Sequence, residues 1–359
     1  MKTKFYSLQK IKKYNATYNI VFGERSNGKT YSVLEESLKQ YFKDGSQLAY
    51  VRRWGEDIKG KRAGMIWAGI NNNGIVEKHS NGEFTGVHYW ASRFYLCNYD
   101  ENGKAIYNDK DILGHTFSLS DGEHNKSISF PHIRVIMFDE FITKGIYLQD
   151  EFVHFMNTVS TIVRKRDDVK IYLLGNTVNR YCPYFGEMGL KHITKMIQGT
   201  IDVYTYGSSK LTVAVEYCAD TSATKENNFY FAFDNPKLEM ITSGAWELDI
   251  YPHLPLKFKP KDIQFIYFIE FNDELFQCEI VLVDDITFTY IHMKTTDIQK
   301  PDKDLIYTLD YKAEMNYNRS IKNPLNKLQE RIYWYFKTDR VFFQNNQVGD
   351  SISNYLKIC

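Results

Sequence analysis

Gly23-Glu24-Arg25-Ser26-Asn27-Gly28-Lys29-Thr30 is the stretch that decides the fold of this chain. It follows an apolar run at residues 18–22 and precedes a segment whose apolar residues recur at helical spacing. A glycine-rich turn between a strand and a helix forms a phosphate-binding P-loop, because backbone N–H groups and the positive helix end surround an anion. We expect all eight residues to bind a nucleoside triphosphate, with Lys29 on its β- and γ-phosphates and Thr30 on Mg²⁺. The flanking strand and helix disfavour the alternative, an ordinary turn with an exposed lysine.

The composition of the 359 residues is that of a globular protein without a strong charge bias. An apolar content of 43% is enough for real cores, and the length predicts about two domains. With 45 basic and 44 acidic residues the net charge is +1, so any contact with nucleic acid has to be a local patch. Aromatic residues make up 16% of the chain, and core packing is their commoner use, with base stacking as the alternative.

Five cysteines are scattered along the chain without a Cys-x-x-Cys pair. This spacing favours a reducing compartment and argues against a zinc module. Residues 1–13 lack the apolar core of a signal peptide, and no run of 18 apolar residues occurs. We therefore expect a soluble, unexported protein without a membrane partner.

Short apolar runs alternate with helical periodicity up to about residue 200, which predicts an α/β fold around a largely parallel sheet. We expect a helix with one apolar face over 152–163, and hairpins and loops over 60–110, where Gly and Asn are frequent. The predicted strands are 18–22, 47–52, 116–119, 134–138 and 170–174.

Beyond residue 207 the alternation stops, and a polar stretch punctuated by prolines follows. Three strand-like runs at 263–271, 275–283 and 287–293 then predict an antiparallel meander, with helices near 323–336 and 350–358. The expected parts are a P-loop ATPase domain (1–204), a linker or lid region (205–255) and a smaller α+β domain (256–359).

An apolar run at 133–138 ends in Asp139 and Glu140, the arrangement of a Walker B segment. Parallel strands present such residues at the edge where the P-loop lies. We expect Asp139 in the Mg²⁺ shell with Thr30, and Glu140 as the base that activates the attacking water. The alternative is a solvated acidic pair at a strand end.

Asn176 follows another predicted core strand, so its amide could sense the γ-phosphate or hold the water; capping a turn is the alternative.

Arg164 and Arg166 close the helix after the Walker B segment. They are either cations that stabilise a helix end or a finger that reaches a neighbouring subunit's triphosphate. Arg52 and Arg53 raise a similar choice between a phosphate contact and surface charge.

Lys59, Lys61 and Arg62 form a local basic patch suited to a DNA backbone, with a solvated loop as the alternative. Lys126 is a further candidate for DNA binding.

The last hundred residues contain Glu270 on a predicted strand, together with Asp284, Asp285 and Asp310. Because a two-metal nuclease needs several carboxylates that converge, we expect this domain to bind without cutting.

Several segments, in the same order, resemble the encapsidation ATPases of small podophages of the Picovirinae type. The resemblance implies an additional-strand (ASCE) ATPase fold joined to an RNase H-like domain without nuclease activity. It also implies Lys29 and Thr30 on the triphosphate, Asp139 on Mg²⁺, Glu140 as base and Arg164 as the finger acting in trans. The segments that carry it are 5–10, the P-loop, 50–53, 126–127, 138–141, 158–166, 176 and 183–185.

The same resemblance implies a homomeric ring of five subunits that translocates double-stranded DNA at the portal vertex of a prohead, in the host cytoplasm. Docking through a structural packaging RNA and docking directly on the portal or capsid both stay open. One departure is Gly55, where relatives have a basic residue. Two other functions stay open as well: a helicase-like ATPase, and a nucleotide-gated scaffold or binding protein.

Overall fold

The computed structural model describes residues 5–121, 128–219, 245–254 and 256–359. The chain divides into two units, Met1–Glu247 and Leu248–Cys359. Within the described ranges, no helix has both the length and the apolar character that crossing a membrane would need.

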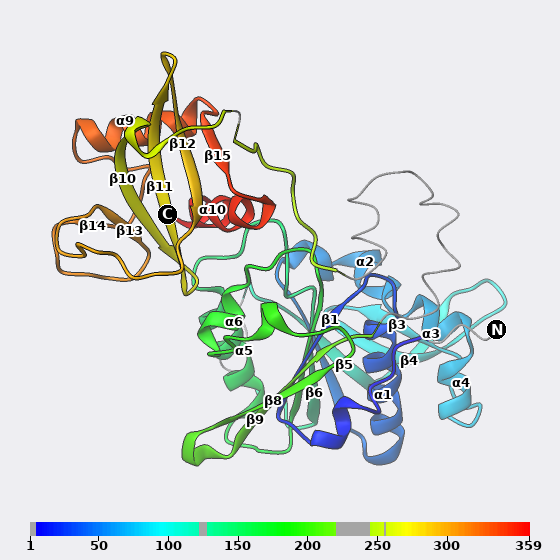
Figure 1. Ribbon diagram of the computed structural model, residues 1–359. Helices are drawn as coiled ribbons and strands as arrows, with labels where there is room; N and C mark the ends of the chain where they lie inside the picture. Colours follow the sequence, from blue (N-terminus) through cyan, green and yellow to red (C-terminus); the bar gives the residue numbers. More distant parts are fainter. Residues whose placement is uncertain (1–4, 122–127, 220–244, 255) are drawn as a thin grey trace. The chain divides into compact units, whose positions relative to one another are not determined.

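The first unit is built on a nine-stranded sheet (Figure 1). Its strands are β1 (Tyr18–Gly23), β2 (Gln47–Arg52), β3 (Gly86–Trp90), β4 (Arg93–Tyr99), β5 (Ala105–Ser118), β6 (Ile133–Asp139), β7 (Lys170–Asn176), β8 (Ile201–Tyr206) and β9 (Leu211–Tyr217). Its helices are α1 (Lys29–Asp44), α2 (Gly60–Met65), α3 (Ala68–Asn72), α4 (Ile75–His79), α5 (Glu151–Val163) and α6 (Pro183–Glu187).

The strand order is β3-β4-β5-β2-β6-β7-β1-β9-β8, and the six strands from β5 to β9 are parallel. The antiparallel strands β3, β4 and β8 lie at the two edges. β7 lies between β1, which leads into the P-loop, and β6, which ends in Asp139. This extra strand between the two motif strands confirms the additional-strand P-loop fold.

β1 is buried along its whole length, as expected of a parallel strand with both faces covered. Ile20 and Phe22 belong to the core that includes the apolar face of α5, whereas Val21 belongs to the core that includes α1. The two helices lie on opposite faces of the sheet (Figure 1). The P-loop therefore joins the middle of the sheet to a helix packed on one face.

The expected strands agree with the structure to within about two residues, except that 116–119 is the end of the much longer β5. The expectation of hairpins and loops over 60–110 was correct for β3 and β4 but wrong for 60–79, where α2, α3 and α4 form. Ala63, Trp67 and Ile70 recur there at helical spacing and are fully buried. Packing of these three side chains outweighs the Gly- and Asn-rich composition.

The first sheet continues past residue 204, because β9 pairs with β1 along five residues. Part of the region expected as a linker, 205–255, is thus a strand of the first unit, and 220–244 lies outside the described residues.

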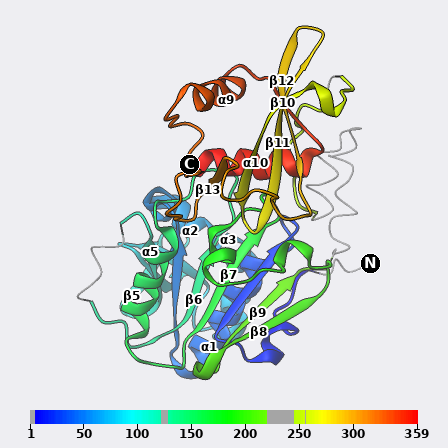
Figure 2. The same ribbon diagram turned by 60° about the vertical axis from the view of Figure 1, so that its left-hand side comes forward.

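The second unit contains a six-stranded sheet in the order β14-β13-β10-β11-β12-β15. β10 to β12 are antiparallel (Figure 2), and β13 runs parallel beside β10 and pairs with β14, the RNase H-like arrangement (Figure 1). Its elements are β10 (Ile263–Phe271), β11 (Glu274–Val283), β12 (Ile286–Met293), β13 (Ile306–Thr308), β14 (Tyr317–Asn318), β15 (Val341–Phe343), α9 (Lys327–Lys337) and α10 (Asn346–Ile358).

The predicted meander is confirmed, and both of its turns are two-residue turns with positive φ, at Asn272-Asp273 and Asp284-Asp285. The two expected helices exist with shifted starts. Asn326 and Asn345 set these starts, because each side-chain oxygen accepts a hydrogen bond from the first turn of the helix that follows.

Candidate active site

The P-loop turn depends on backbone conformations that glycine adopts without strain. Gly23 and Gly28 have φ of 149° and 92°. A Cβ at Gly23 would also lie 3.0 Å from the Cβ of Cys218, a contact so tight that Cys218 would have to move. The loop ends at the N-terminus of α1, and the N–H groups in the first turn of a helix have no partner within the helix, so they can bind an anion.

Lys29 connects the P-loop to the neighbouring strand β7. Its Nζ donates hydrogen bonds to the Glu24 carbonyl oxygen (2.5 Å), to Asn27 Oδ1 (3.2 Å) and to Asn176 Oδ1 (3.1 Å). Burial lowers the pKa of Lys29. The parallel register of β1 and β7 places Gly23 beside Asn176, so the expected sensor amide does lie at the P-loop.

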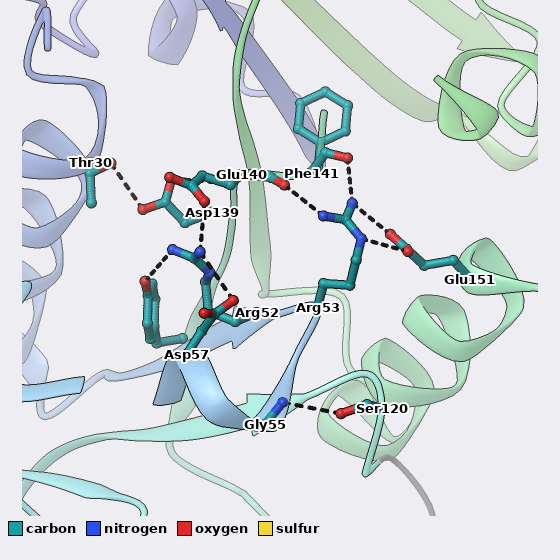
Figure 3. A network of polar contacts seen from close by, with 11 residues as sticks. Thr30, Arg52, Arg53, Gly55, Asp57, Ser120, Asp139, Glu140, Phe141 and Glu151 are labelled. Carbon is teal, nitrogen blue, oxygen red and sulfur yellow. Dashed lines mark hydrogen bonds and ion pairs between the residues drawn. The ribbon is translucent and has the colours of Figure 1, made fainter. Parts of the chain in front are cut away.

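Thr30 and Asp139 meet at the end of β6. Thr30 Oγ1 donates to Asp139 Oδ2 over 3.1 Å (Figure 3). Burial raises the pKa of the Asp139 carboxyl, and the nearby Arg52 opposes this shift. A hydroxyl and a carboxylate side by side are hard oxygen donors, so these two residues fit a Mg²⁺ ion.

These groups line a cavity of about 690 Å³, which is within the usual range for a cofactor-sized site. Its walls come from the P-loop, from the ends of β6 and β7, and from the loop that follows β6. The lining residues are Arg25, Ser26, Asn27, Gly28, Lys29, Thr30, Tyr31, Asp139, Glu140, Ile142, Thr143, Lys144, Gly145, Leu174, Gly175, Asn176 and Val178.

Glu140 has an unusual backbone and a side chain held by an arginine. Its φ is 58°, which costs a residue other than glycine on the order of 1 kcal/mol. Its Oε2 lies 2.6 Å from Arg52 Nη2, and its side chain is 57% exposed (Figure 3). The expected base therefore lies at the cavity but has its carboxylate turned to Arg52.

Arg52 and Arg53 do not line the cavity, and each pairs with a carboxylate rather than standing as a plain surface charge. Arg52 contacts Glu140, Asp57 (3.2 Å) and the Tyr50 hydroxyl (3.3 Å). Burial opposes the charge of Arg52, but Tyr50 and Glu140 together raise its pKa.

Arg53 clamps the backbone that follows Asp139. It donates to both carboxylate oxygens of the buried Glu151 (2.7 and 2.9 Å), and to the carbonyl oxygens of Glu140 (3.2 Å) and Phe141 (2.8 Å) (Figure 3). The Tyr184 hydroxyl also donates to Glu151 (3.0 Å). Sequence reasoning missed this clamp; the available signal was an Arg-Arg pair at the end of a strand that neighbours the Walker B strand.

Arg164 does not line the cavity of its own chain. It caps α5 with φ of 42°, is exposed, and donates to the Ile128 carbonyl oxygen over 2.8 Å. Arg166 has a structural role, because it donates to five backbone carbonyl groups around Phe130–Ile133 and the end of α5.

In the part of the chain that the structure describes, the cations predicted to bind DNA are not among the residues that line the cavity. Lys59, Lys61 and Arg62 are exposed at the start of α2, where Lys59 pairs with Glu56 over 3.1 Å. Lys126 lies outside the described residues. A Cβ at Gly55 would lie 2.3 Å from Asp121 Oδ2, but that atom ends an exposed side chain that can move aside, so sterics alone do not require glycine there.

In the second unit, Glu270 is on β10 and Asp284 and Asp285 form a turn. Among the described residues, no group of three or more His, Cys, Asp or Glu side chains is placed to hold a metal ion. The absence of nuclease activity stays a prediction.

Comparison with known proteins finds relatives of this chain. A family model described as "Podovirus DNA encapsidation protein (Gp16)" matches residues 1–68 and 84–348. The DNA packaging protein of Bacillus phage phi29 is 22% identical over 276 residues, which cover 76% of this chain and 74% of that protein. The DNA packaging protein of Bacillus phage B103 is 28% identical over 180 residues, or 49% of each chain.

Two solved structures share the fold along nearly the full length. The structure described as the bacteriophage Phi-29 viral genome packaging motor assembly has a TM-score of 0.58 at 22% identity and covers 99% of each chain. The Phi-28 gp11 DNA packaging motor has a TM-score of 0.52 at 17% identity, covering 99% of this chain and 98% of that one. Since the family model also spans both units, this chain belongs to the podovirus DNA encapsidation protein family.

Proposed function

We propose that this chain is an ATP-driven motor that moves double-stranded viral DNA into a preformed prohead. The observation that carries the proposal is the convergence of Lys29, Thr30 and Asp139 at one cavity, in a chain of the encapsidation family. A phosphate-binding loop, a place for Mg²⁺ and an adjacent carboxylate are the parts that hydrolysis of a nucleoside triphosphate needs.

In the proposed reaction, the P-loop N–H groups and Lys29 bind the phosphates. Thr30 and Asp139 would hold Mg²⁺, which supplies charge neutralisation. Glu140 accepts a proton from water as the water oxygen bonds to the γ-phosphorus and the bond to the bridging oxygen of ADP breaks. Asn176 is suited to orient that water or the γ-phosphate, because its amide lies within 3.1 Å of Lys29.

Glu140 has to leave Arg52 before it can act, since the ion pair occupies its Oε2. We propose that this exchange separates a resting site from a reacting one. Arg53 keeps hold of the Glu140 carbonyl oxygen, so the side chain can turn while the peptide stays in place.

The base is tested by measuring ATP binding and turnover of Glu140→Gln. We expect binding to be retained and turnover to fall by about 100-fold or more, because the amide cannot accept the proton. Asp57→Asn is the matched control, as it changes the other carboxylate on Arg52 without touching the cavity lining. Unchanged turnover in Glu140→Gln would remove the assigned base; it would also favour a scaffold in which hydrolysis is incidental.

The partners belong to the same proposal. We propose a homomeric ring, five subunits in number, docked at the portal of a prohead in the host cytoplasm, either directly or through a packaging RNA. The similarity to the phi29 packaging motor assembly supports a ring. Arg164, exposed at the end of α5, would enter the neighbour's cavity as a finger, and Lys59, Lys61, Arg62 and Lys126 would contact the DNA backbone.

The proposed roles of these cations, DNA binding and action in trans, can be distinguished by measuring ATPase activity with and without DNA. Alanine at Lys59, Lys61 and Arg62 should abolish stimulation by DNA and leave the basal rate unchanged. Arg164→Ala subunits mixed into wild-type rings should lower turnover more steeply than their fraction, because each one also disables a neighbour's site. A strictly proportional fall would argue against a finger acting in trans.

A further inference from the structure

Glu247 connects three of the loops that form the nucleotide cavity. Its Oε1 lies 3.1 Å from Arg25 Nη2 on the P-loop, and its Oε2 lies 2.8 Å from Lys144 Nζ on the loop after β6. Its backbone N–H donates to the carbonyl oxygen of Thr177, just after β7, over 2.8 Å. Arg25 and Lys144 both line the cavity, yet Glu247 does not.

The residue before it holds this segment in place. Trp246 is 7% exposed and packs against the rings of Phe22 and Tyr217, with centroid distances of 5.3 and 6.4 Å. Glu247 itself has a side chain that is only 11% exposed, whereas those of Arg25 and Lys144 are 49% and 43% exposed. The carboxylate is therefore fixed at one end by the core, while the two cations can move.

The charges around Glu247 favour an exchange in which Arg25 and Lys144 leave its carboxylate for phosphate oxygens. Two cations share one carboxylate, and both stand where a triphosphate with several negative charges would bind. Ion pairs of this exposure contribute little to stability, so phosphate oxygens can replace the carboxylate. Glu247 is also the last residue of the first unit, and Leu248 begins the second.

Resting on the proposed nucleotide site, we propose that Glu247 is a positioning residue that competes with the triphosphate for Arg25 and Lys144. Nucleotide binding takes both cations from Glu247 and loosens the end of the first unit. Release of the nucleotide restores both ion pairs. The occupancy of the cavity is thus transmitted to the segment that continues into the second unit.

The test measures two quantities on the full chain: affinity for a non-hydrolysable ATP analogue with Mg²⁺, and hydrogen exchange of the backbone over 245–250. In the wild type, the analogue should speed exchange of this segment. Glu247→Gln should bind the analogue about three- to tenfold more tightly and AMP almost unchanged, since only the polyphosphate competes with the carboxylate. Its exchange over 245–250 should be fast with or without nucleotide.

Glu101→Gln, an exposed carboxylate in the turn between β4 and β5, is the matched control and should behave as wild type. A purely structural role of Glu247 would shift the affinities for AMP and the analogue alike. Lys144→Gln removes one of the two ion pairs from a more exposed position, and should speed exchange over 245–250 without nucleotide even if Glu247→Gln does not fold.

Two results would overturn the inference alone. Both presuppose that the wild type binds the analogue and that Lys29→Ala abolishes this binding. One result is an unchanged affinity for the analogue in folded Glu247→Gln. The other is hydrogen exchange over 245–250 that changes neither when the analogue is added nor in Lys144→Gln. If the wild type does not bind the analogue at all, the proposed function fails and the inference fails with it.

Discussion

Arg52 and Arg53 are neighbours at the end of β2, and each pairs with a carboxylate beside the expected catalytic centre. Arg53 is 6% exposed and Glu151 is 2% exposed, and the two share a bidentate contact. Arg52 instead meets Glu140, whose side chain is 57% exposed. One step along the strand thus separates a fixed ion pair from one that water can reach.

The difference follows from where the two side chains point. Arg52 is the last residue of β2 and Arg53 the first after it, and their side chains extend in different directions (Figure 3). Glu151 begins α5 and is further held by Tyr184 and by the Leu148 N–H group. Glu140 has a backbone N–H contact to Asp139 and an exposed side chain. The first pair has a structural role, and the second is suited to change partner.

The largest effect is expected when the buried pair loses its cation. Arg53→Ala should lower the free energy of unfolding by about 3–5 kcal/mol, because Glu151 keeps a buried charge without its main partner. Urea unfolding followed by tryptophan fluorescence measures this, since four of the five tryptophans are in the first unit. The double variant Arg53→Met with Glu151→Leu should lose less than Arg53→Ala. If Arg53→Ala lowers the free energy of unfolding by less than about 1 kcal/mol, the Arg53–Glu151 pair contributes no more to stability than the Arg52–Glu140 pair.

An intermediate effect is expected at the second donor to the buried carboxylate. Tyr184→Phe removes one hydrogen bond to Glu151 and leaves the ring contacts, so unfolding should become easier by about 1.5 kcal/mol. Tyr206→Phe, which removes a hydroxyl that donates to the Met188 carbonyl oxygen, is a control with an uncharged acceptor and should cost less. Equal losses would mean that the charge of Glu151 does not matter.

The smallest change in stability is expected at the pair of Arg52 with the exposed Glu140, where the change in rate is the more informative quantity. Arg52→Ala should alter the free energy of unfolding by about 1 kcal/mol or less. Basal ATP turnover should rise up to about fivefold, because Glu140 no longer has to leave its partner. Turnover as low as that of Glu140→Gln would show instead that Arg52 is needed for the reaction.

The parts of the fold that depend on local pattern could be predicted from sequence. The P-loop, the apolar run before Asp139 and the meander after residue 262 are each contained in fewer than about 35 consecutive residues, and the structure agrees with them. The helices over 60–79 could not be predicted in this way. They are stabilised by the burial of Trp67 and Ile70 against a sheet whose edge strands, β3 and β4, come later in the chain.

Within the site, the P-loop residues, Asp139 and Asn176 were found from motif and strand position. The partners of Arg53 and of Glu247 were not. Arg53 and Glu151 are 98 residues apart, and they meet because β6 lies beside β2 and leads to α5. Arg25 and Glu247 meet through a packing contact of Trp246 that no local spacing indicates. Such pairs depend on strand order, which a single sequence specifies only indirectly.

The position of β1 also has a consequence for how the chain is made. β1 and the P-loop are synthesised well before the two neighbours of β1, which are β7 and β9, and β9 ends at Tyr217. Pairing over such separations is slow, and an apolar strand without neighbours is prone to aggregate. The nascent chain therefore carries an unpaired Tyr18–Gly23 strand until β7 has left the ribosome, and a half-paired one until β9 has followed; a chaperone that shields this strand in that period should raise the yield of folded protein.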